Sequence, residues 1–258
     1  MPVFTARIEN GVARLVFDRP PLNIVDLATA REMERVLGDV TARDDVDVVL
    51  LEARGRVFSA GVDVPDHLPG RGEQMIPAFH AVCLALQEMA APVVAAVHAP
   101  AIGGGCELAL ACDLVIAARS ATFSQPEIRL GVIAPFASLV LPERIGSALA
   151  ADLLLTGRAL TADEALSAGI VSRVADDPGF PAAVDGLIDE LRALSPSSLR
   201  IAKRALRMKH PPPRPAEIAA VEQLYLRELM NSPDAVEGLR SFMEKRPPGW
   251  TPADPRRT

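Results

Sequence analysis

Aromatic residues are scarce in this sequence of 258 residues, where they make up 4% of the total and include one tryptophan and one tyrosine. Apolar residues still amount to 49%. The core must therefore consist mainly of alanine, valine, leucine and isoleucine side chains. A chain of this length can bury a full core as one large domain, or as one domain with an appendage.

Cysteine is also rare. The three cysteines, Cys83, Cys106 and Cys112, lie in apolar surroundings, their number is odd, and their spacing matches no metal site. We therefore expect buried, reduced thiols, no metal ion and a cytoplasmic protein. The N-terminal stretch lacks a charged start followed by an apolar run, so no secretion signal is visible.

The sequence also has no excess of positively charged residues. Asp and Glu number 33 against 27 Lys and Arg, which leaves a net charge of −6. This balance argues against nucleic acid as the main partner, although it allows a local basic patch. No apolar run is long enough to cross a membrane without interruption: the best candidate, residues 91–118, is broken by Pro92, Pro100, Glu107 and Asp113. We expect no membrane partner.

The stretch 91–118 nevertheless organises the chain. It predicts a buried strand at 93–97, a glycine turn at 103–105, a short helix at 106–112 and a second strand at 114–117. Glycines at a helix entrance let a ligand approach free backbone amides, and the helix dipole favours an anion there. Glu107 would lie within reach of that ligand. The alternative is a tight buried turn in which Glu107 merely caps its helix, and these residues alone do not decide.

The rest of the chain alternates between strand and helix patterns up to about residue 195. Strands are predicted at 3–8, 12–17, 46–52 and 170–174, the first two forming a hairpin around Asn10-Gly11. Helices are predicted after Asp26, around 75–89, at 149–155, after Thr161, and at 182–193, 196–208, 215–231 and 233–245. Alternation favours parallel-type α/β architecture. We predict a core of residues 1–195 and a helical region of residues 196–258.

Some reactive side chains have a simpler interpretation. His98 ends an apolar strand and is expected to be a hydrogen-bonded core residue rather than a base. Ser59 and Ser138 show no partner pattern for a nucleophile. A basic stripe could contact phosphate, but a solvated helix face is the favoured interpretation. The stripe comprises Arg200, Lys203, Arg204 and Arg207.

Several motifs carry a family resemblance when taken together in this order. They are RPPLN at 19–23, FSAGVD at 58–63, GGGCELALACD at 103–113, FSQPEIRLG at 123–131, LLLTGRALTADEALSAGIVSRV at 153–174 and GLRSFMEKR at 238–246. Over nearly its whole length the chain resembles the crotonase, or enoyl-CoA hydratase/isomerase, family. The resemblance implies a spiral of ββα units followed by helices that build homotrimers, usually paired into hexamers. It also implies an acyl-coenzyme A substrate and no separate cofactor.

The resemblance further implies the site. Backbone amides at Val62 and Gly104 match the pair that holds the thioester oxygen and stabilises the enolate, each donor being worth about 3–4 kcal/mol. Glu107 and Glu127 match the two glutamates of hydratases. A hydro-lyase adding water syn to an enoyl-CoA or cyclic dienoyl-CoA is therefore expected, with Glu107 on the water and Glu127 supplying the proton. The alternatives are an isomerase or thioester hydrolase, and a non-catalytic acyl-CoA-binding protein.

Contacts to coenzyme A follow from the same resemblance. The backbone around Ala60, Asp63 and Val64 would hold the adenine, and Lys245 would reach the nucleotide phosphates of a neighbouring subunit. Family members often carry a lysine two residues after that aspartate, where this chain has Pro65. One ionic contact is then missing.

The segment 132–142 departs from hydratases of linear chains. An apolar, proline-stiffened loop replaces their paired glycines, and its residues Pro135 and Phe136 are candidates to border the acyl pocket. It resembles the segment of family members that hydrate cyclohexa-1,5-diene-1-carbonyl-CoA. This favours a cyclic or branched acyl group, and the alternative is drift among ordinary hydratases.

Overall fold

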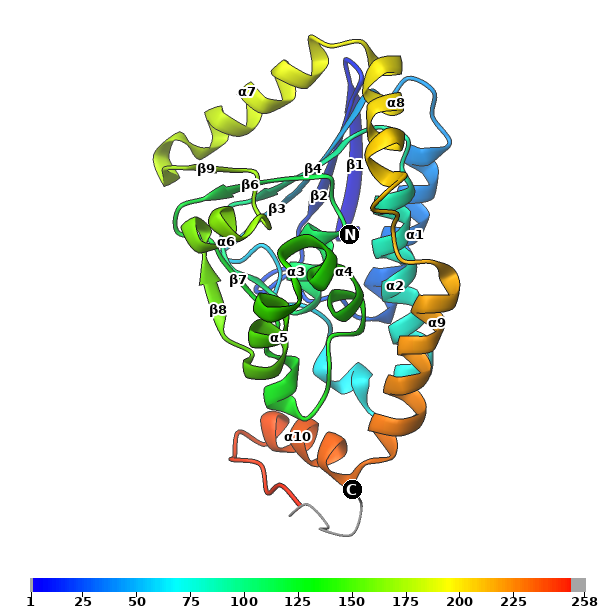
Figure 1. The fold of residues 1–258 in the computed structure, drawn as a ribbon, viewed down its shortest axis with the longest axis vertical. Helices are drawn as coiled ribbons and strands as arrows, with labels where there is room; N and C mark the ends of the chain where they lie inside the picture. The colour runs from blue at the N-terminus through cyan, green and yellow to red at the C-terminus, as the bar shows by residue number, and fades with distance from the viewer. Residues whose placement is uncertain (1, 252–258) are drawn as a thin grey trace.

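A six-stranded sheet crosses the computed structural model, which describes residues 2–251 (Figure 1). The strand order is β1-β2-β3-β4-β6-β9, and every pairing after the β1–β2 hairpin is parallel. The strands are β1 (Phe4–Glu9), β2 (Val12–Phe17), β3 (Val48–Ala53), β4 (Val93–Val97), β6 (Leu114–Ala118) and β9 (Arg173–Ala175). Valine and alanine dominate β3, β4 and β6 because both faces of the sheet are covered.

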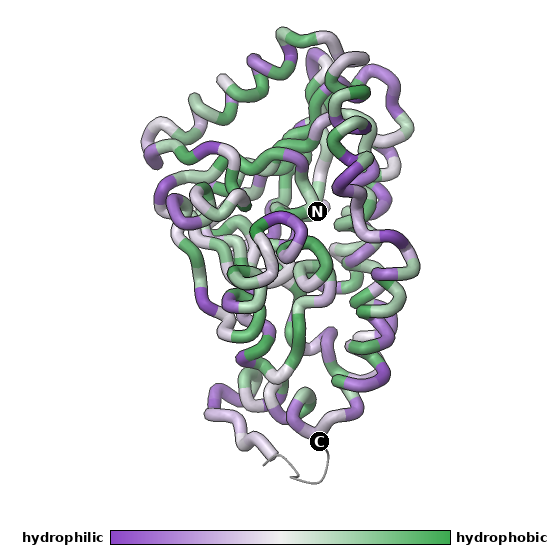
Figure 2. Tube along the Cα trace, in the orientation of Figure 1, coloured by the Kyte–Doolittle hydropathy of each residue, from purple (hydrophilic) through white to green (hydrophobic). Residues whose placement is uncertain are grey.

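Helices lie on both faces. One face packs against α7 (Phe180–Arg192), which lies at the opposite end of the molecule from α10 (Pro233–Met243) in Figure 1. The other face carries the main core, whose apolar residues run through the interior of the trace (Figure 2). The helices on that side are α1 (Leu27–Thr41), α2 (Gly72–Glu88), α3 (Gly104–Leu110), α4 (Pro135–Ile145), α5 (Ser147–Thr156) and α6 (Ala162–Ala168).

A second, three-stranded sheet was not anticipated from the sequence. It comprises β5 (Ala101–Ile102), β7 (Thr122–Ser124) and β8 (Ala159–Thr161), in the order β5-β7-β8. Each strand has only two or three residues. This sheet connects the start of the glycine turn to the segment before Glu127. It therefore fixes the segments that carry the two predicted carboxylates relative to each other.

The C-terminal helices close the structure. After α8 (Pro196–Arg207), α9 (Pro215–Gln223) continues into a π-helical turn, η4 (Leu224–Glu228), and a 3₁₀ turn, η5 (Leu229–Asn231). Helix α10 packs against two 3₁₀ turns of the core, η1 (Val64–His67) and η2 (Pro126–Leu130). A third 3₁₀ turn, η3 (Asp177–Gly179), precedes α7. The division at residue 195 stays a prediction.

Local signals in the sequence are confirmed. Asn10 and Gly11 take left-handed φ values of 50° and 79° in the β1–β2 turn. Asp26 caps α1, and Thr161 forms a capping box with Glu164 at α6. Ser232 caps α10, whose first residue is a proline.

Three boundaries were wrong. Helix α3 begins at Gly104 rather than at residue 106, because Gly103 alone makes the reversal and the next two glycines already have helical backbone. The expected loop at 132–142 is helix from Pro135 onward, since proline is preorganised for a first helical position. The last strand starts at Arg173, where pairing with β6 begins, rather than at residue 170.

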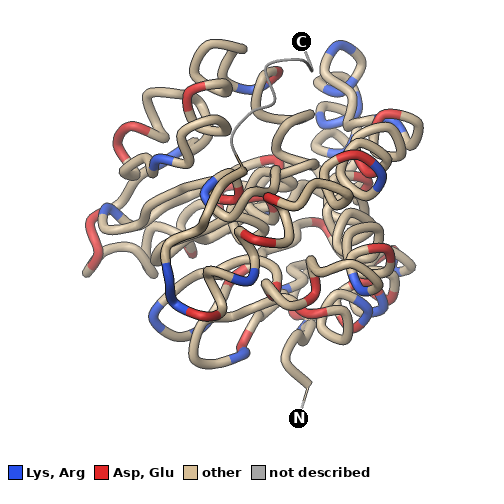
Figure 3. Tube along the Cα trace, turned by 90° about the horizontal axis from the view of Figure 1, so that it is seen from below, with Lys and Arg blue, Asp and Glu red and all other residues tan. Residues whose placement is uncertain are grey.

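Charges of both signs are interspersed along the chain (Figure 3). Among residues 2–251, no group of three or more His, Cys, Asp or Glu side chains is arranged to hold a metal ion. Within the same range, no helix has the length and apolar character needed to span a membrane.

Candidate active site

The glycine turn is built by close packing. Gly103 has a φ of 54°, and a side chain there would lie 2.5 Å from Oε1 of Glu127. A Cβ on Gly104 would approach Val62 Cγ2 to 2.9 Å. On Gly105 it would collide with the carbonyl oxygen of Ser59. All three positions therefore need glycine, for reasons that differ from one to the next.

Two backbone amides face each other across this contact. Gly61 has a φ of 90°, and a Cβ there would lie 3.0 Å from the amide nitrogen of Gly104. A Cβ on Gly104 would in turn lie 3.3 Å from the amide nitrogen of Val62. Within residues 2–251, neither N–H donates to a backbone carbonyl outside its own helix or strand. The Val62 and Gly104 amides thus lie close together, with both donors available for a ligand oxygen.

The loop that carries Val62 is fixed by Asn23. The side-chain amide of Asn23 donates to the carbonyl oxygens of Arg54 (2.7 Å), Val57 (3.0 Å) and Phe58 (3.2 Å). Ser59 Oγ donates to the Asn23 carbonyl oxygen over 2.7 Å and accepts from the Gly61 amide over 3.1 Å. Ser59 is therefore committed to backbone bonds, in keeping with the absence of a nucleophile pattern.

Glu107 lies in α3 and is 3% exposed. The Ala137 amide donates to its Oε1 over 2.8 Å, and the Phe136 amide also bonds to the carboxylate. Both donors belong to the first turn of α4, where the helix dipole favours negative charge. Burial raises the pKa of Glu107, whereas the charge of His80 and the two amides lower it.

Glu127 comes from η2, and its carboxylate lies beside Gly103. The Gln125 amide nitrogen, oriented as its surroundings require, lies 3.2 Å from both Glu127 carboxylate oxygens. Burial and the nearby charge of Glu107 raise the pKa of Glu127 to about 8. The surroundings of the two carboxyls therefore differ: backbone amides and the charge of His80 counteract the effect of burial at Glu107, whereas the pKa of Glu127 is raised to about 8.

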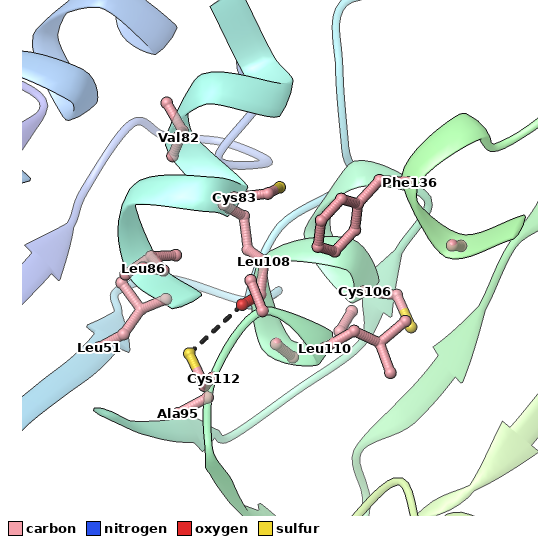
Figure 4. Close-up of a cluster of buried hydrophobic side chains, with 14 of the residues drawn as sticks. Leu51, Val82, Cys83, Leu86, Ala95, Cys106, Leu108, Leu110, Cys112 and Phe136 are labelled. Carbon is pink, nitrogen blue, oxygen red and sulfur yellow. Dashed lines mark hydrogen bonds between the residues drawn. The ribbon is translucent and has the colours of Figure 1, made fainter. Parts of the chain in front are cut away.

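Buried apolar side chains of α2, α3 and α4 pack together around α3 (Figure 4). The ring of Phe136 is fully buried and points toward α2, where Cys83 lies. Cys112 Sγ contacts the Leu108 carbonyl oxygen at 3.3 Å. The three cysteines are buried free thiols, and burial raises the pKa of each. Phe136 therefore backs the site as a core residue, while its amide holds Glu107.

Comparison with known proteins identifies this arrangement. The family model "Enoyl-CoA hydratase/isomerase" matches residues 7–253. The chain belongs to this family. It is 41% identical over 242 residues to cyclohexa-1,5-dienecarbonyl-CoA hydratase of Thauera aromatica, covering 94% of this chain and 93% of that protein. It is 34% identical to a putative enoyl-CoA hydratase of Thermus thermophilus, covering 94% and 98%.

Comparison with solved structures leads to the same family. Carnitinyl-CoA hydratase from Mycobacterium avium superposes with a TM-score of 0.86 at 30% identity, covering 98% of this chain and all of that one. The predicted crotonase-type fold is confirmed, and so is the expectation of an enoyl-CoA hydratase-like enzyme. The roles of individual residues are a separate matter and rest on the geometry above.

The residues expected at coenzyme A fall into two groups. Ala60, Asp63 and Val64 flank Val62 and are each partly exposed. Burial, followed by the charges of Asp66 and Asp26, raises the pKa of Asp63. Lys245 lies exposed just beyond α10, with a φ of 55°. Because α10 packs on η1 and η2, Lys245 follows a helix that already borders both the Val62 loop and the Glu127 turn.

The basic stripe on α8 is only partly the solvated face that the sequence favoured, because Arg204 is exposed but Lys203 is buried. Lys203 is 7% exposed and bonds to the Ala91 carbonyl oxygen over 2.8 Å and to Asp113. Arg207 reaches the same Asp113 carboxylate at 3.0 Å. These contacts anchor α8 to the residues that precede β4 and β6. His98 contacts the Gly55 carbonyl oxygen at 2.9 Å, so the expected hydrogen bond is present, but His98 is only partly buried and is not the core residue that the sequence predicted.

Sequence reasoning missed four polar residues around the site: Asn23, His80, Gln125 and Tyr225. Their signals were present but weak. Asn23 and Gln125 stand inside the motifs RPPLN and FSQPE, and the chain's one tyrosine is wholly buried. His80 lies next to Phe79 in a stripe that predicted only core packing. Their partners are far away in sequence, so no local pattern identifies them.

Proposed function

We propose that this protein adds water syn across a double bond conjugated to the thioester carbonyl of an acyl-coenzyme A, with a cyclic dienoyl group as the preferred substrate. The observation that carries the proposal is the pair of carboxylates, buried Glu107 and half-buried Glu127, beside the neighbouring amides of Val62 and Gly104. Acid, base and oxyanion donors are then present in one place.

Glu107 acts as the base. It removes a proton from water, whose oxygen attacks Cβ of the conjugated bond, and the electron pair moves to the thioester oxygen. The Ala137 and Phe136 amides and the charge of His80 support this role, because all three favour the ionised carboxylate.

Glu127 acts as the acid. It delivers its proton to Cα of the enolate, which restores the carbonyl, and transfer of a proton from Glu107 to Glu127 regenerates the resting state. A pKa of about 8 supports this role, since Glu127 then carries its proton at neutral pH. The two carboxyls titrate as a pair.

Val62 and Gly104 donate their N–H groups to the enolate oxygen. The left-handed φ of Gly61 and the close approach between Gly61 and Gly104 support this assignment. The adenine lies along the backbone of Ala60, Asp63 and Val64, and Lys245 contacts the nucleotide phosphates.

A cyclic acyl group is supported by the sequence around α4 and by the relatives. The relative named cyclohexa-1,5-dienecarbonyl-CoA hydratase is 41% identical, against 34% for the Thermus enoyl-CoA hydratase. Pro135 and Phe136 stand where linear-chain hydratases have flexible glycines. A stiff helical start here makes a pocket of fixed shape, which suits a ring better than a mobile chain.

We further propose a homotrimer, or a hexamer of paired trimers, in the cytoplasm. Exposed apolar side chains on α8 and after α9 support assembly: Ile201, Leu206, Met208 and Leu224. Three buried free thiols support a reducing compartment.

The test is water addition by the purified protein. Crotonyl-CoA and a cyclic 1,5-dienoyl-CoA are incubated separately, loss of the conjugated thioester absorbance is followed, and product mass is checked for one added water. Turnover of the cyclic substrate in preference to crotonyl-CoA supports the proposal in full. Faster turnover of crotonyl-CoA removes the ring preference. Binding of both thioesters without added water overturns the hydratase assignment and favours isomerase or hydrolase chemistry, or simple binding.

A further inference from the structure

Near Glu107 lies a buried histidine, His80, that is hydrogen-bonded to a second carboxylate, Glu222. His80 lies in α2 and is 1% exposed, and its Nδ1 is 2.7 Å from Oε1 of Glu222 in α9. The Glu222 side chain is itself only 16% exposed. A carboxylate can only accept, so Nδ1 carries a proton and donates it. With a second proton on Nε2, the ring is a positively charged imidazolium.

This pair is placed against the residues that hold Glu107. The His80 ring lies 6.5 Å from the Phe136 ring, between centroids, at a tilt of 33°. The amide of that same Phe136, together with the Ala137 amide, bonds to the Glu107 carboxylate. The charge of His80 acts directly on Glu107 and lowers its pKa. Helices α2, α3, α4 and α9 thus meet at one buried carboxylate.

We propose that the Glu222–His80 pair is a positioning device for Glu107, holding a buried positive charge near this carboxylate and so making Glu107, rather than Glu127, the base. The inference rests on the proposed function for its catalytic meaning. His80 touches no reacting atom in this scheme. It acts through Glu107, and Glu222 acts through His80.

The charged and titratable groups of the neighbouring elements fit this arrangement. Glu127 in η2 is the one other carboxylate named for the chemistry, and the Glu107 charge raises its pKa. Cys83 lies one turn along α2 from His80, and burial followed by the Glu107 charge raises its pKa. Burial, followed by the charges of both carboxylates, raises the pKa of Tyr225 in η4. The hydroxyl of Tyr225 is hydrogen-bonded to His67 Nδ1 over 2.7 Å. Arg31 of α1 contacts Gln74, which lies near the N-terminus of α2.

Without the pair, the asymmetry of the carboxylates is reduced. Glu107 would keep its backbone donors but lose the charge of His80, so its pKa would rise further. Activity would then fall on the acid side, where Glu107 is no longer ionised, and would recover at higher pH. A purely structural role for His80 would lower activity equally at every pH.

The test combines a pH profile with a direct titration. His80→Gln and Glu222→Gln are compared with the wild type, and His98→Gln is the control, because His98 bonds only to the Gly55 carbonyl oxygen. We expect the acid limb of kcat/KM to move up by about one pH unit in both test variants, a roughly tenfold loss on that limb, with little loss at the pH optimum. The control should match the wild type. A loss that is uniform across pH overturns the proposal.

Carbon-13 NMR of glutamate-labelled protein reads the same effect without turnover. The Glu107 signal, assigned with Glu107→Gln, should titrate at higher pH in His80→Gln. An unchanged midpoint overturns the inference even if hydration is normal, whereas a shifted midpoint in a protein that adds no water overturns only the proposed function. Nitrogen NMR of the wild type needs no variant: protons on both ring nitrogens of His80 support the proposal, and a neutral ring contradicts it.

Discussion

The amide of Ala137 donates to Oε1 of Glu107 over 2.8 Å. This bond ties the segment that departs from linear-chain hydratases to the carboxylate that we propose as the base. The N-terminus of α4 therefore has two roles: Pro135 begins a stiff helix, and the next two amides stabilise a buried negative charge. We therefore expect substitutions at the start of α4 to affect the ionisation of Glu107 as well as the proposed acyl preference.

Asn23→Ala should destabilise the protein and lower kcat. The buried side-chain amide satisfies three carbonyl oxygens of the loop that leads to Val62, and leaving buried acceptors unpaired costs about 1–3 kcal/mol each. Chemical denaturation measures the loss. Asn10→Ala is the control, because Asn10 has the same φ of 50° but lies exposed in a hairpin turn. Equal losses in the two variants would show that backbone conformation, not the clamp, matters.

Gly61→Ala should lower kcat by about 10²- to 10³-fold, the usual effect of losing one oxyanion donor. The new methyl would lie 2.8 Å from the Ile102 carbonyl oxygen and 3.0 Å from the Gly104 amide, so the facing amides must separate. Gly55→Ala is matched in backbone strain, with a φ of 89°, but meets nothing within 4 Å. Steady-state kinetics should show near wild-type kcat for Gly55→Ala. A comparable loss there would contradict the assignment of Val62 and Gly104.

Glu127→Gln should make the folded state more stable, and increasingly so as pH rises. Folding raises the pKa of Glu127 from 4.5 to about 8, so the protonated group favours folding at acid pH and that contribution is lost between these two values. The variant has no such loss. Its melting temperature should exceed that of the wild type by a margin that grows from about pH 5 to about pH 8. Glu143→Gln, at a carboxyl whose side chain is 77% exposed, should show a constant difference.

Lys203→Met should cost about 3 kcal/mol of stability without changing KM for acyl-CoA, because removing one member of a buried ion pair leaves the other poorly neutralised. Asp113 keeps Arg207 and the Val93 amide, which limits the loss. Arg204→Met, at an exposed position of the same helix, should leave stability and KM as they are. A raised KM with normal stability in Lys203→Met would instead restore a phosphate-binding role for the stripe.

Features with a local cause were predictable from the sequence. Asp26, Thr161 with Glu164, and Ser232 act within a few residues of themselves, so their caps appear in the sequence as short patterns. The Asn10-Gly11 turn has the same property. The core stripe of α2 also follows from spacing alone, and its Met75, Phe79, Val82 and Leu86 are all buried.

Features that depend on contacts between distant parts of the chain were not predictable from the sequence. The strands of the small sheet are too short to leave a periodic pattern, and their pairing depends on the turn at Gly103. Lys203 looked like a solvated residue because its partner Asp113 is 90 positions earlier. His80 and Glu222 are separated by 142 positions. In the site, the motifs pointed to both carboxylates, but the bond from the Ala137 amide to Glu107 is visible only in the structure.

The most direct test of the two-carboxylate account is to compare Glu107→Gln and Glu127→Gln with the wild type under single-turnover conditions. Water addition is measured by product mass, and affinity for a saturated acyl-CoA is measured in parallel. We predict a rate loss of about 10²- to 10⁴-fold in each variant, the usual contribution of a general acid or base, with affinity unchanged. Wild-type rates of water addition in either variant would contradict the account.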